Sequence, residues 1–383
     1  MRKLLIFSFL ISLIIYFLTS AGKTPYDYFT RLSDAFLDGR YYLTENPPWL
    51  SELVPASPGK YFVIQPPMPA ILALPFKFLL KDLFQQQYLA HILGALTVTL
   101  SMVLSFRIKK DRKLSIWSGI LVGLGSIVWY LSATGSVWYL GQVTSLLFLT
   151  AAITEAFGKR RPFLMGIFIG GGFLSRIHTI LSLPLFIFLL KANKRNIFKK
   201  LLLLGLGMAP FFLFNFFYNY VRFGTIFDKG YFLVPGILSE PWFSKGMLSI
   251  GYIPEHLRIL FLGLPKILSR FPYIEPSWYG LSILITTPAF VFALKPSLKE
   301  NLVKLLWLSI LLIFTLVALR GGTGWTQFGY RYAVDFYPFL TLLTIKGVSQ
   351  TGVKWYHWLL LIFGVIVNLW GVIWINKFGW VSF

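Results

Sequence analysis

Long runs of apolar residues, separated by short polar stretches, follow one another along nearly the whole chain. A helix needs about 20 apolar residues to cross a bilayer core of about 30 Å, and stretches close to that length recur from Leu4 to Ile375. They predict spanning helices near residues 4–20, 85–106, 114–131, 138–157, 162–175, 177–190, 198–220, 277–294, 301–319, 333–346 and 355–376. The chain is therefore expected to be an all-α, polytopic transmembrane helical bundle with about 11 spans.

The composition agrees with lipid as the main solvent of the chain. Of its 383 residues, 56% are hydrophobic and only 13% are charged, which is outside the range of ordinary soluble domains. A closed barrel would also satisfy its backbone in lipid, but barrels show short alternating segments rather than runs such as LLIFSFLISLIIYFL. The chain has no cysteine, which excludes disulfides and thiolate catalysis.

Basic residues between the apolar runs set the orientation. They lie at Arg2 and Lys3 and in two clusters: Arg107, Lys109, Lys110, Arg112 and Lys113, and Lys191, Lys194, Arg195, Lys199 and Lys200. The positive-inside rule assigns these loops to the cytoplasm, so an uncleaved first helix anchors the chain in the plasma (inner) membrane. The N-terminus is then inside and the C-terminus outside. The net charge of +22 is explained without a nucleic acid partner.

This topology gives one integral membrane domain, residues 1–383, with two long outer loops at residues 21–84 and 222–276. In the first loop, PPMPAILALPFKFLL is interpreted as an outer interfacial helix. All of the 14 acidic residues fall in outer segments except Asp111, Glu155 and Glu300. The orientation rule gives acidic residues little weight, so function is one candidate cause of this clustering.

The first outer loop begins with an amphipathic segment, PYDYFTRLSDAFLDGRYYL at residues 25–43. The helical period places Asp27, Arg31, Asp34 and Asp38 along one stripe of this juxtamembrane helix. A carboxylate at the mouth of a lipid-embedded cleft can act as general base on an acceptor hydroxyl, and a nearby Arg can keep it ionised. The alternative is a solvated charged face, which stays open above all for Asp34 and Asp38.

A series of motifs follows the first helix: an Asp, an AFLxGRxYL-type stretch and a Pro-rich loop with YFVIQPPMPAILALPF. Further along, the chain contains GGGFLSRIHTILSLP, YNYVRFGTIFDKGY and WTQFGYRYAVDFYPFL, so the motifs cover most of its length. In this order they resemble the membrane glycosyltransferases of the GT-C superfamily, including the mannosyltransferase-like members of glycosyltransferase family 39.

The resemblance implies an inverting hexosyl- or mannosyltransferase that works on the outer face of the membrane. Its donor would be a sugar linked to a polyprenyl phosphate, and its acceptor a glycan, a lipid or a protein. An Asp of the first outer loop would be the general base. Asp27 matches that position best, and Asp34 in LSDAFLDGR is the rival.

A lipid phosphate gains negative charge as its bond to the sugar breaks, so cations near the interface would stabilise it. The candidates at predicted outer helix ends are Arg176, His178, Arg222, Arg320 and Arg331. For each one alone, the alternative is a snorkelling or topology-setting charge. Tyr330 and Arg331 in GYRYAVD could bind phosphate, or Arg331 could pair with Asp335 across one turn.

The sequence requires no cofactor. Its four histidines show no metal-ligand spacing, although Asp27 and Asp34 could together hold a magnesium or manganese ion. Most aromatic residues fit interfacial belts and helix packing. Those in outer loops, where a sugar could reach them, are Tyr26, Tyr28, Trp49, Tyr61, Trp242 and Trp325.

Two other functions stay open. A lipid or solute transporter, such as a flippase, would line a path through the membrane with charges, whereas the centres of these predicted spans are nearly free of them. A non-catalytic scaffold would bind a partner with its outer loops and would tolerate loss of Asp27 and Asp34.

Overall fold

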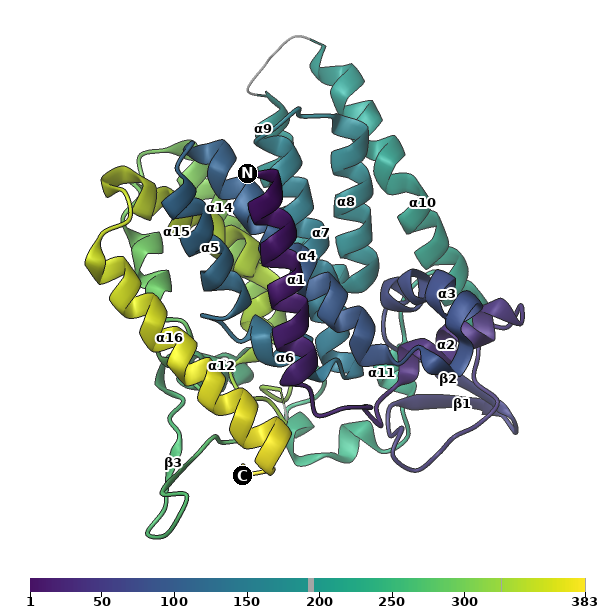
Figure 1. The fold of residues 1–383 in the computed structure, drawn as a ribbon. Coiled ribbons are helices and arrows are strands. Elements are labelled where there is room, and N and C mark those ends of the chain that lie inside the picture. The colour runs from purple at the N-terminus through teal and green to yellow at the C-terminus, as the bar shows by residue number, and fades with distance from the viewer. Residues whose placement is uncertain (192–195, 325, 383) are drawn as a thin grey trace.

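The computed structural model describes residues 1–191, 196–324 and 326–382, which form a bundle of helices with short elements gathered at one end (Figure 1). Lys194, Arg195 and Trp325 of the sequence analysis lie outside these residues. The N-terminus lies at one end of the bundle and the C-terminus at the other. The end near the C-terminus also carries most of residues 21–84 and 222–282, and we name it the loop end.

Five of the described helices are long and apolar enough to cross a membrane. They are α4 (Gln86–Ile108), α7 (Val137–Ala156), α10 (Ile197–Phe223), α14 (Asn301–Ala318), and α16 (Trp355–Ile373) with its π-helical continuation η8 (Trp374–Phe378). A sixth span results if α5 (Arg112–Gly123) and α6 (Val128–Thr134), which are bent by 55° at their junction, are one broken helix. The expected total of about 11 spans stays a prediction.

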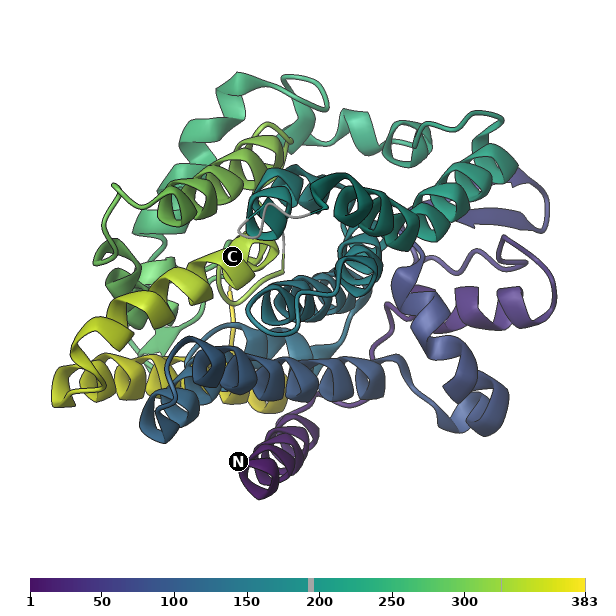
Figure 2. The same cartoon turned by 90° about the horizontal axis from the view of Figure 1, so that it is seen from above.

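Other predicted spans are helical but shorter than a full crossing. They are α1 (Arg2–Leu18), α8 (Pro162–Ser175), η2 (Ile177–Ser182) with α9 (Leu183–Lys191), and η7 (Arg331–Phe336) with α15 (Tyr337–Thr351). Figure 2 shows α1 at the edge of the bundle, where it packs against α4. Its outward side chains such as Phe7 and Phe17 are exposed, as expected for a helix that faces lipid.

The predicted span at residues 277–294 is not a continuous helix. The segment forms two short helices, α13 (Ile283–Thr286) and η6 (Pro288–Leu294), and Leu281 before them bridges to Gly329. Pro288 lacks the backbone N–H that would continue α13, and it starts a new turn instead. One side of η6 packs against α15 and α16, and its other side leaves Val291 and Leu294 exposed.

The loop end is built from the two long loops. The first contains α2 (Tyr28–Leu37), the antiparallel hairpin of β1 (Leu53–Ser57) and β2 (Lys60–Val63), α3 (Met68–Leu80) and η1 (Lys81–Leu83). The second contains α11 (Gly230–Leu233), η3 (Ile237–Ser239), η4 (Pro241–Phe243), η5 (Ile250–Tyr252), α12 (Ile253–Leu262), and the hairpin of β3 (Lys266–Ile267) and β4 (Ile274–Glu275). The helices expected from PYDYFTRLSDAFL and PPMPAILALPFKFLL are confirmed as α2 and α3, which pack against each other.

Helices α8 and α10 approach closely because glycines face each other between them. A Cβ atom on Gly166 would overlap the carbonyl oxygen of Leu204, and one on Gly207 would overlap the carbonyl oxygen of Phe163. Small residues of this kind let helix backbones pack directly in lipid, where the hydrophobic effect does not drive helices together.

We predict that Gly207→Ala destabilises the bundle by about 1–3 kcal/mol, because the added methyl group forces α8 and α10 apart. The matched control is Gly205→Ala on the same helix, where an added Cβ meets nothing within 4 Å. Thermal unfolding of the purified protein in detergent should show a lower midpoint for the first variant alone. Equal midpoints would contradict this account of the α8–α10 contact.

Candidate active site

A cavity of about 1060 Å³ opens at the loop end. Its wall combines both long loops, the start of α7 and the segment that follows α14. The lining includes Tyr26, Trp49, Glu52, Trp138, Trp242, Glu255, His256, Tyr279, Arg320, Arg331 and Tyr332. The volume suits a substrate the size of a sugar phosphate together with part of a second molecule.

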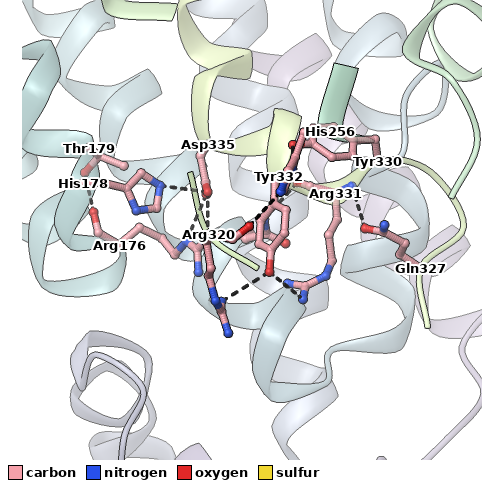
Figure 3. A network of polar contacts seen from close by, with 11 residues as sticks. Arg176, His178, Thr179, His256, Arg320, Gln327, Tyr330, Arg331, Tyr332 and Asp335 are labelled. Atoms are coloured by element: carbon pink, nitrogen blue, oxygen red, sulfur yellow. Dashed lines mark hydrogen bonds and ion pairs between the residues drawn. The ribbon is translucent and has the colours of Figure 1, made fainter. Parts of the chain in front are cut away.

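Two guanidinium groups face this cavity from the segment after α14. Arg320 Nη1 lies 3.3 Å and Arg331 Nη2 lies 3.5 Å from the Tyr332 hydroxyl oxygen, so the phenol stands between the two cations (Figure 3). Arg331 is only 6% exposed. Within the part of the chain that the structure describes, no carboxylate forms an ion pair with either Arg, and the Nε atom of each has no hydrogen-bond partner.

The pKa of Tyr332 reflects the strength of this positive charge. Burial raises the pKa of the phenol, but the guanidinium groups of Arg320, Arg331 and Arg176 lower it by more. The resulting pKa lies below the ordinary value for tyrosine. Because buried cations without an ion-pair partner are costly, the arrangement favours binding of an anion at this point of the cavity.

Buried glutamine side chains hold the backbone of Arg331. Gln327 accepts the Arg331 backbone N–H at 3.0 Å and donates to the carbonyl oxygens of Tyr279 and Gly324. Gln142 on α7 donates to the Arg331 carbonyl oxygen at 2.8 Å. Gly324 has a φ of +91°, a conformation that glycine adopts without strain, and a side chain there would overlap Gln327.

Arg176 and His178, both predicted to bind phosphate, contact the carboxylate of Asp335 instead. Arg176 donates to both Asp335 oxygens, at 3.1 and 2.6 Å, and His178 Nε2 lies 2.9 Å from the second (Figure 3). The Asp335 side chain is fully buried, and Arg176 and His178 do not line the cavity. The pairing of Arg331 with Asp335, the other interpretation of GYRYAVD, is absent from the described residues.

Arg222 and Tyr330 also have their polar atoms engaged by protein. Arg222 donates to the carbonyl oxygen of Val63 at 2.5 Å and to Asn219 at 2.7 Å, and its guanidinium lies 3.9 Å from the Tyr218 ring centre. These contacts join α10 to β2. The hydroxyl of Tyr330 points to His256 on α12, at 2.7 Å.

The predicted base candidates lie on α2, and neither lines the cavity. Asp27 accepts from Arg31 at 2.6 Å and directly follows the cavity residue Tyr26. Asp34 pairs with Lys77 of α3 at 3.0 Å. Burial raises the pKa of Asp34, and the nearby Lys77 offsets only part of that rise. The sequence-based assignment of Asp27 or Asp34 as base stays a prediction.

Glu52 is a cavity carboxylate that the sequence analysis did not single out. Its Oε2 atom accepts from Gln65 Nε2 at 2.6 Å and from Trp138 Nε1 at 3.0 Å. Glu52 lies in an irregular stretch just before β1, where no helical period draws attention to it. The indication that the sequence did offer was that Glu52 lies in an outer loop enriched in carboxylates.

No group of three or more His, Asp or Glu side chains among the described residues is arranged to hold a metal ion. Asp27 and Asp34 are seven residues apart on one helix, which separates their backbones by about 10 Å. Each contacts a different cationic side chain. The two carboxylates are thus engaged separately, and a magnesium or manganese ion shared by them stays a prediction.

The comparisons with known proteins identify the fold. No family model and no curated protein sequence matches the chain. Among solved structures, ArnT from Cupriavidus metallidurans bound to undecaprenyl phosphate superposes with a TM-score of 0.54 at 13% identity, over 95% of this chain and 63% of ArnT. Apo ArnT gives a TM-score of 0.55 at 13% identity, over 95% and 62%.

The Archaeoglobus fulgidus oligosaccharyltransferase, in its apo form, gives a TM-score of 0.54 at 13% identity, over 98% of this chain and 55% of that one. The chain thus spans less than two thirds of the length of these proteins. Both are GT-C glycosyltransferases, so the expected GT-C-like polytopic membrane fold is confirmed. At 13% identity the likeness concerns the fold alone.

We predict that Asp335→Asn lowers the free energy of unfolding by about 3–5 kcal/mol, because it leaves the largely buried Arg176 without its counter-charge. The control is Asp38→Asn, which removes the exposed partner of Arg40 and should cost at most about 1 kcal/mol. Thermal unfolding in detergent compares the two variants. A loss no larger for Asp335→Asn than for Asp38→Asn would contradict a structural role for this ion pair.

Proposed function

We propose that this chain is a membrane glycosyltransferase that moves a sugar, a hexose such as mannose, from a polyprenyl-phosphate-linked donor to an acceptor. The observation that carries the proposal is the pair Arg320 and Arg331, two guanidinium groups without a carboxylate partner in the described residues, beside a cavity of about 1060 Å³. The GT-C-like fold supports the reaction class, and ArnT, which shares this fold, is bound to undecaprenyl phosphate in one structure.

Arg320 and Arg331 suit the leaving phosphate. During transfer the acceptor oxygen bonds to the anomeric carbon, and the bond from that carbon to the phosphate oxygen breaks with its electron pair left on the phosphate. Charge therefore grows on the phosphate oxygens as the reaction proceeds, and fixed guanidinium donors stabilise that charge more strongly in the transition state than in the bound donor. A single displacement of this kind inverts the anomeric centre. The guanidinium groups supply the positive charge, so the proposal assigns no role to a divalent ion.

Glu52 is our first candidate for the general base that takes the proton of the acceptor hydroxyl. It shares the cavity wall with Arg320 and Arg331, and the base and the phosphate cations must lie within the length of one substrate. Gln65 and Trp138 donate to one carboxylate oxygen, which leaves the other available to a proton. Asp27, next to the cavity residue Tyr26, is the alternative, and Asp34 is the third candidate.

We propose that the loop end faces the outside of the plasma membrane. Helix α4 is 23 residues long: it begins near the cavity, where Gln86 donates to the Tyr26 carbonyl oxygen, and ends at the basic cluster that starts with Arg107. The opposite end of the bundle therefore carries that cluster, and the positive-inside rule favours the cytoplasm for it. The acceptor, a glycan, a lipid or a protein, would then approach from outside, and the N-terminus would be cytoplasmic.

We predict that Arg331→Gln weakens binding of undecaprenyl phosphate about 30-fold or more, since removing a charged partner from a buried phosphate contact costs about 2 kcal/mol or more. The matched control is Arg258→Gln on α12, whose guanidinium is exposed and paired with Glu255. Affinity is measured by titrating the lipid phosphate into each detergent-solubilised variant. Unchanged affinity in Arg331→Gln would overturn the phosphate site.

We predict that Glu52→Gln lowers the transfer rate from a labelled polyprenyl-phosphate sugar about 10²- to 10⁴-fold, the usual contribution of a general base, with little change in affinity for the lipid phosphate. Asp27→Asn and Asp34→Asn are assayed in parallel. Should one of these two abolish transfer while Glu52→Gln stays active, the base is an aspartate of α2. Lipid transport without any sugar transfer in the wild type would instead support a flippase.

A further inference from the structure

We infer that His256 is a positioning residue that sets the relative placement of Arg320 and Arg331. This inference rests on the proposed function, because it assigns a role within the same phosphate site. His256 belongs to α12 in the second long loop, its side chain is fully buried, and it lines the cavity. Both of its ring nitrogens contact the segment that carries the two arginines (Figure 3).

The partners of His256 fix its tautomer. Nε2 lies 3.0 Å from the carbonyl oxygen of Arg320, which can only accept, so Nε2 carries the hydrogen. In the neutral ring Nδ1 is then bare, and it accepts the hydroxyl hydrogen of Tyr330 at 2.7 Å. The ring thus donates a hydrogen bond to the backbone of Arg320 and accepts one from Tyr330, the residue before Arg331.

The surroundings of His256 favour the neutral ring. Burial lowers the pKa of the imidazole, and the positive charge of Arg320 lowers it further. The contact with the Arg320 carbonyl and the negative charge of Glu255 raise the pKa, but they offset only part of the decrease, so the net shift is downward. The phenols of Tyr330 and Tyr332 complete the polar groups around the ring, with ring centres at 5.8 and 6.2 Å.

The two contacts add to those that Gln327 and Gln142 make with the glycine-rich segment that carries the two arginines. Residues 321–329 hold four glycines, and Gly322 and Gly324 adopt positive φ values of +80° and +91°. The two guanidinium groups flank one phenol oxygen and repel each other. A ring that binds the Arg320 backbone on one side and the residue before Arg331 on the other resists that repulsion. The two cations are then already held together before the anion binds, so binding does not have to supply that free energy.

The test is a double-mutant cycle on binding of undecaprenyl phosphate. His256→Gln keeps an amide donor for the Arg320 carbonyl and loses the acceptor for Tyr330, whereas Tyr330→Phe removes the same hydrogen bond from the other side. We expect each variant to raise the Kd about tenfold and the double variant to raise it no further. Independent effects that multiply to about a hundredfold, or no effect of either variant, would overturn the inference.

A matched control separates positioning from general stability. His357 is also buried, but it accepts the backbone N–H of Lys354 at the end of the bundle opposite the cavity. His357→Gln should lower the thermal midpoint and leave the Kd unchanged. His256→Asn restores an acceptor near the Nδ1 position, and we expect it to recover part of the affinity that His256→Gln loses. A lower Kd for His256→Gln than for His256→Asn would contradict the role assigned to Nδ1.

Failure of this inference can be told apart from failure of the proposed function. If Arg331→Gln weakens lipid phosphate binding while His256→Gln and Tyr330→Phe bind as the wild type does, the phosphate site stands and the positioning role is overturned. If Arg331→Gln itself binds normally, the phosphate site is overturned, and the positioning role is overturned with it.

Discussion

Repulsion between Arg320 and Arg331 is the constraint around which the loop end is organised. The other candidate cations of the chain have protein partners: Arg176 contacts Asp335, Arg222 contacts Val63 and Asn219, and Lys77 contacts Asp34. These three are satisfied without any ligand. Arg320 and Arg331 are held side by side by backbone contacts, with a phenol oxygen as their shared acceptor. The lack of an ion-pair partner, rather than the presence of charge alone, is what makes these two arginines the candidates for anion binding.

Most of the fold could be predicted from the apolar runs, because lipid leaves the backbone little choice besides a helix. The amphipathic stripe of residues 25–43 and the apolar stretch of α3 likewise predicted helices that the structure contains. The prediction of one continuous helix at residues 277–294 was wrong because an apolar run does not show where a helix is interrupted. Only the proline at position 288 indicated the break.

The site was harder to predict, because its members come together from distant parts of the chain. Arg176, Arg222 and Arg331 have the same residue type at predicted helix ends, and the sequence could not say which of them would meet a partner. Glu52 was missed because its two donors, Gln65 and Trp138, follow it by 13 and 86 residues. His256 had no local motif, since its contacts lie 64 and 74 residues away.

Tyr332 has a consequence for the kind of ion that the cavity selects. While its oxygen accepts from two guanidinium groups, its own hydrogen is repelled by both and turns away from them. A tetrahedral oxyanion that contacts a guanidinium group has further oxygens, and one of them can accept this hydrogen. A spherical halide offers no second atom for that hydrogen. Under the proposed function, the phenol would therefore select the anion by its shape, whereas the two arginines alone would select it only by its charge.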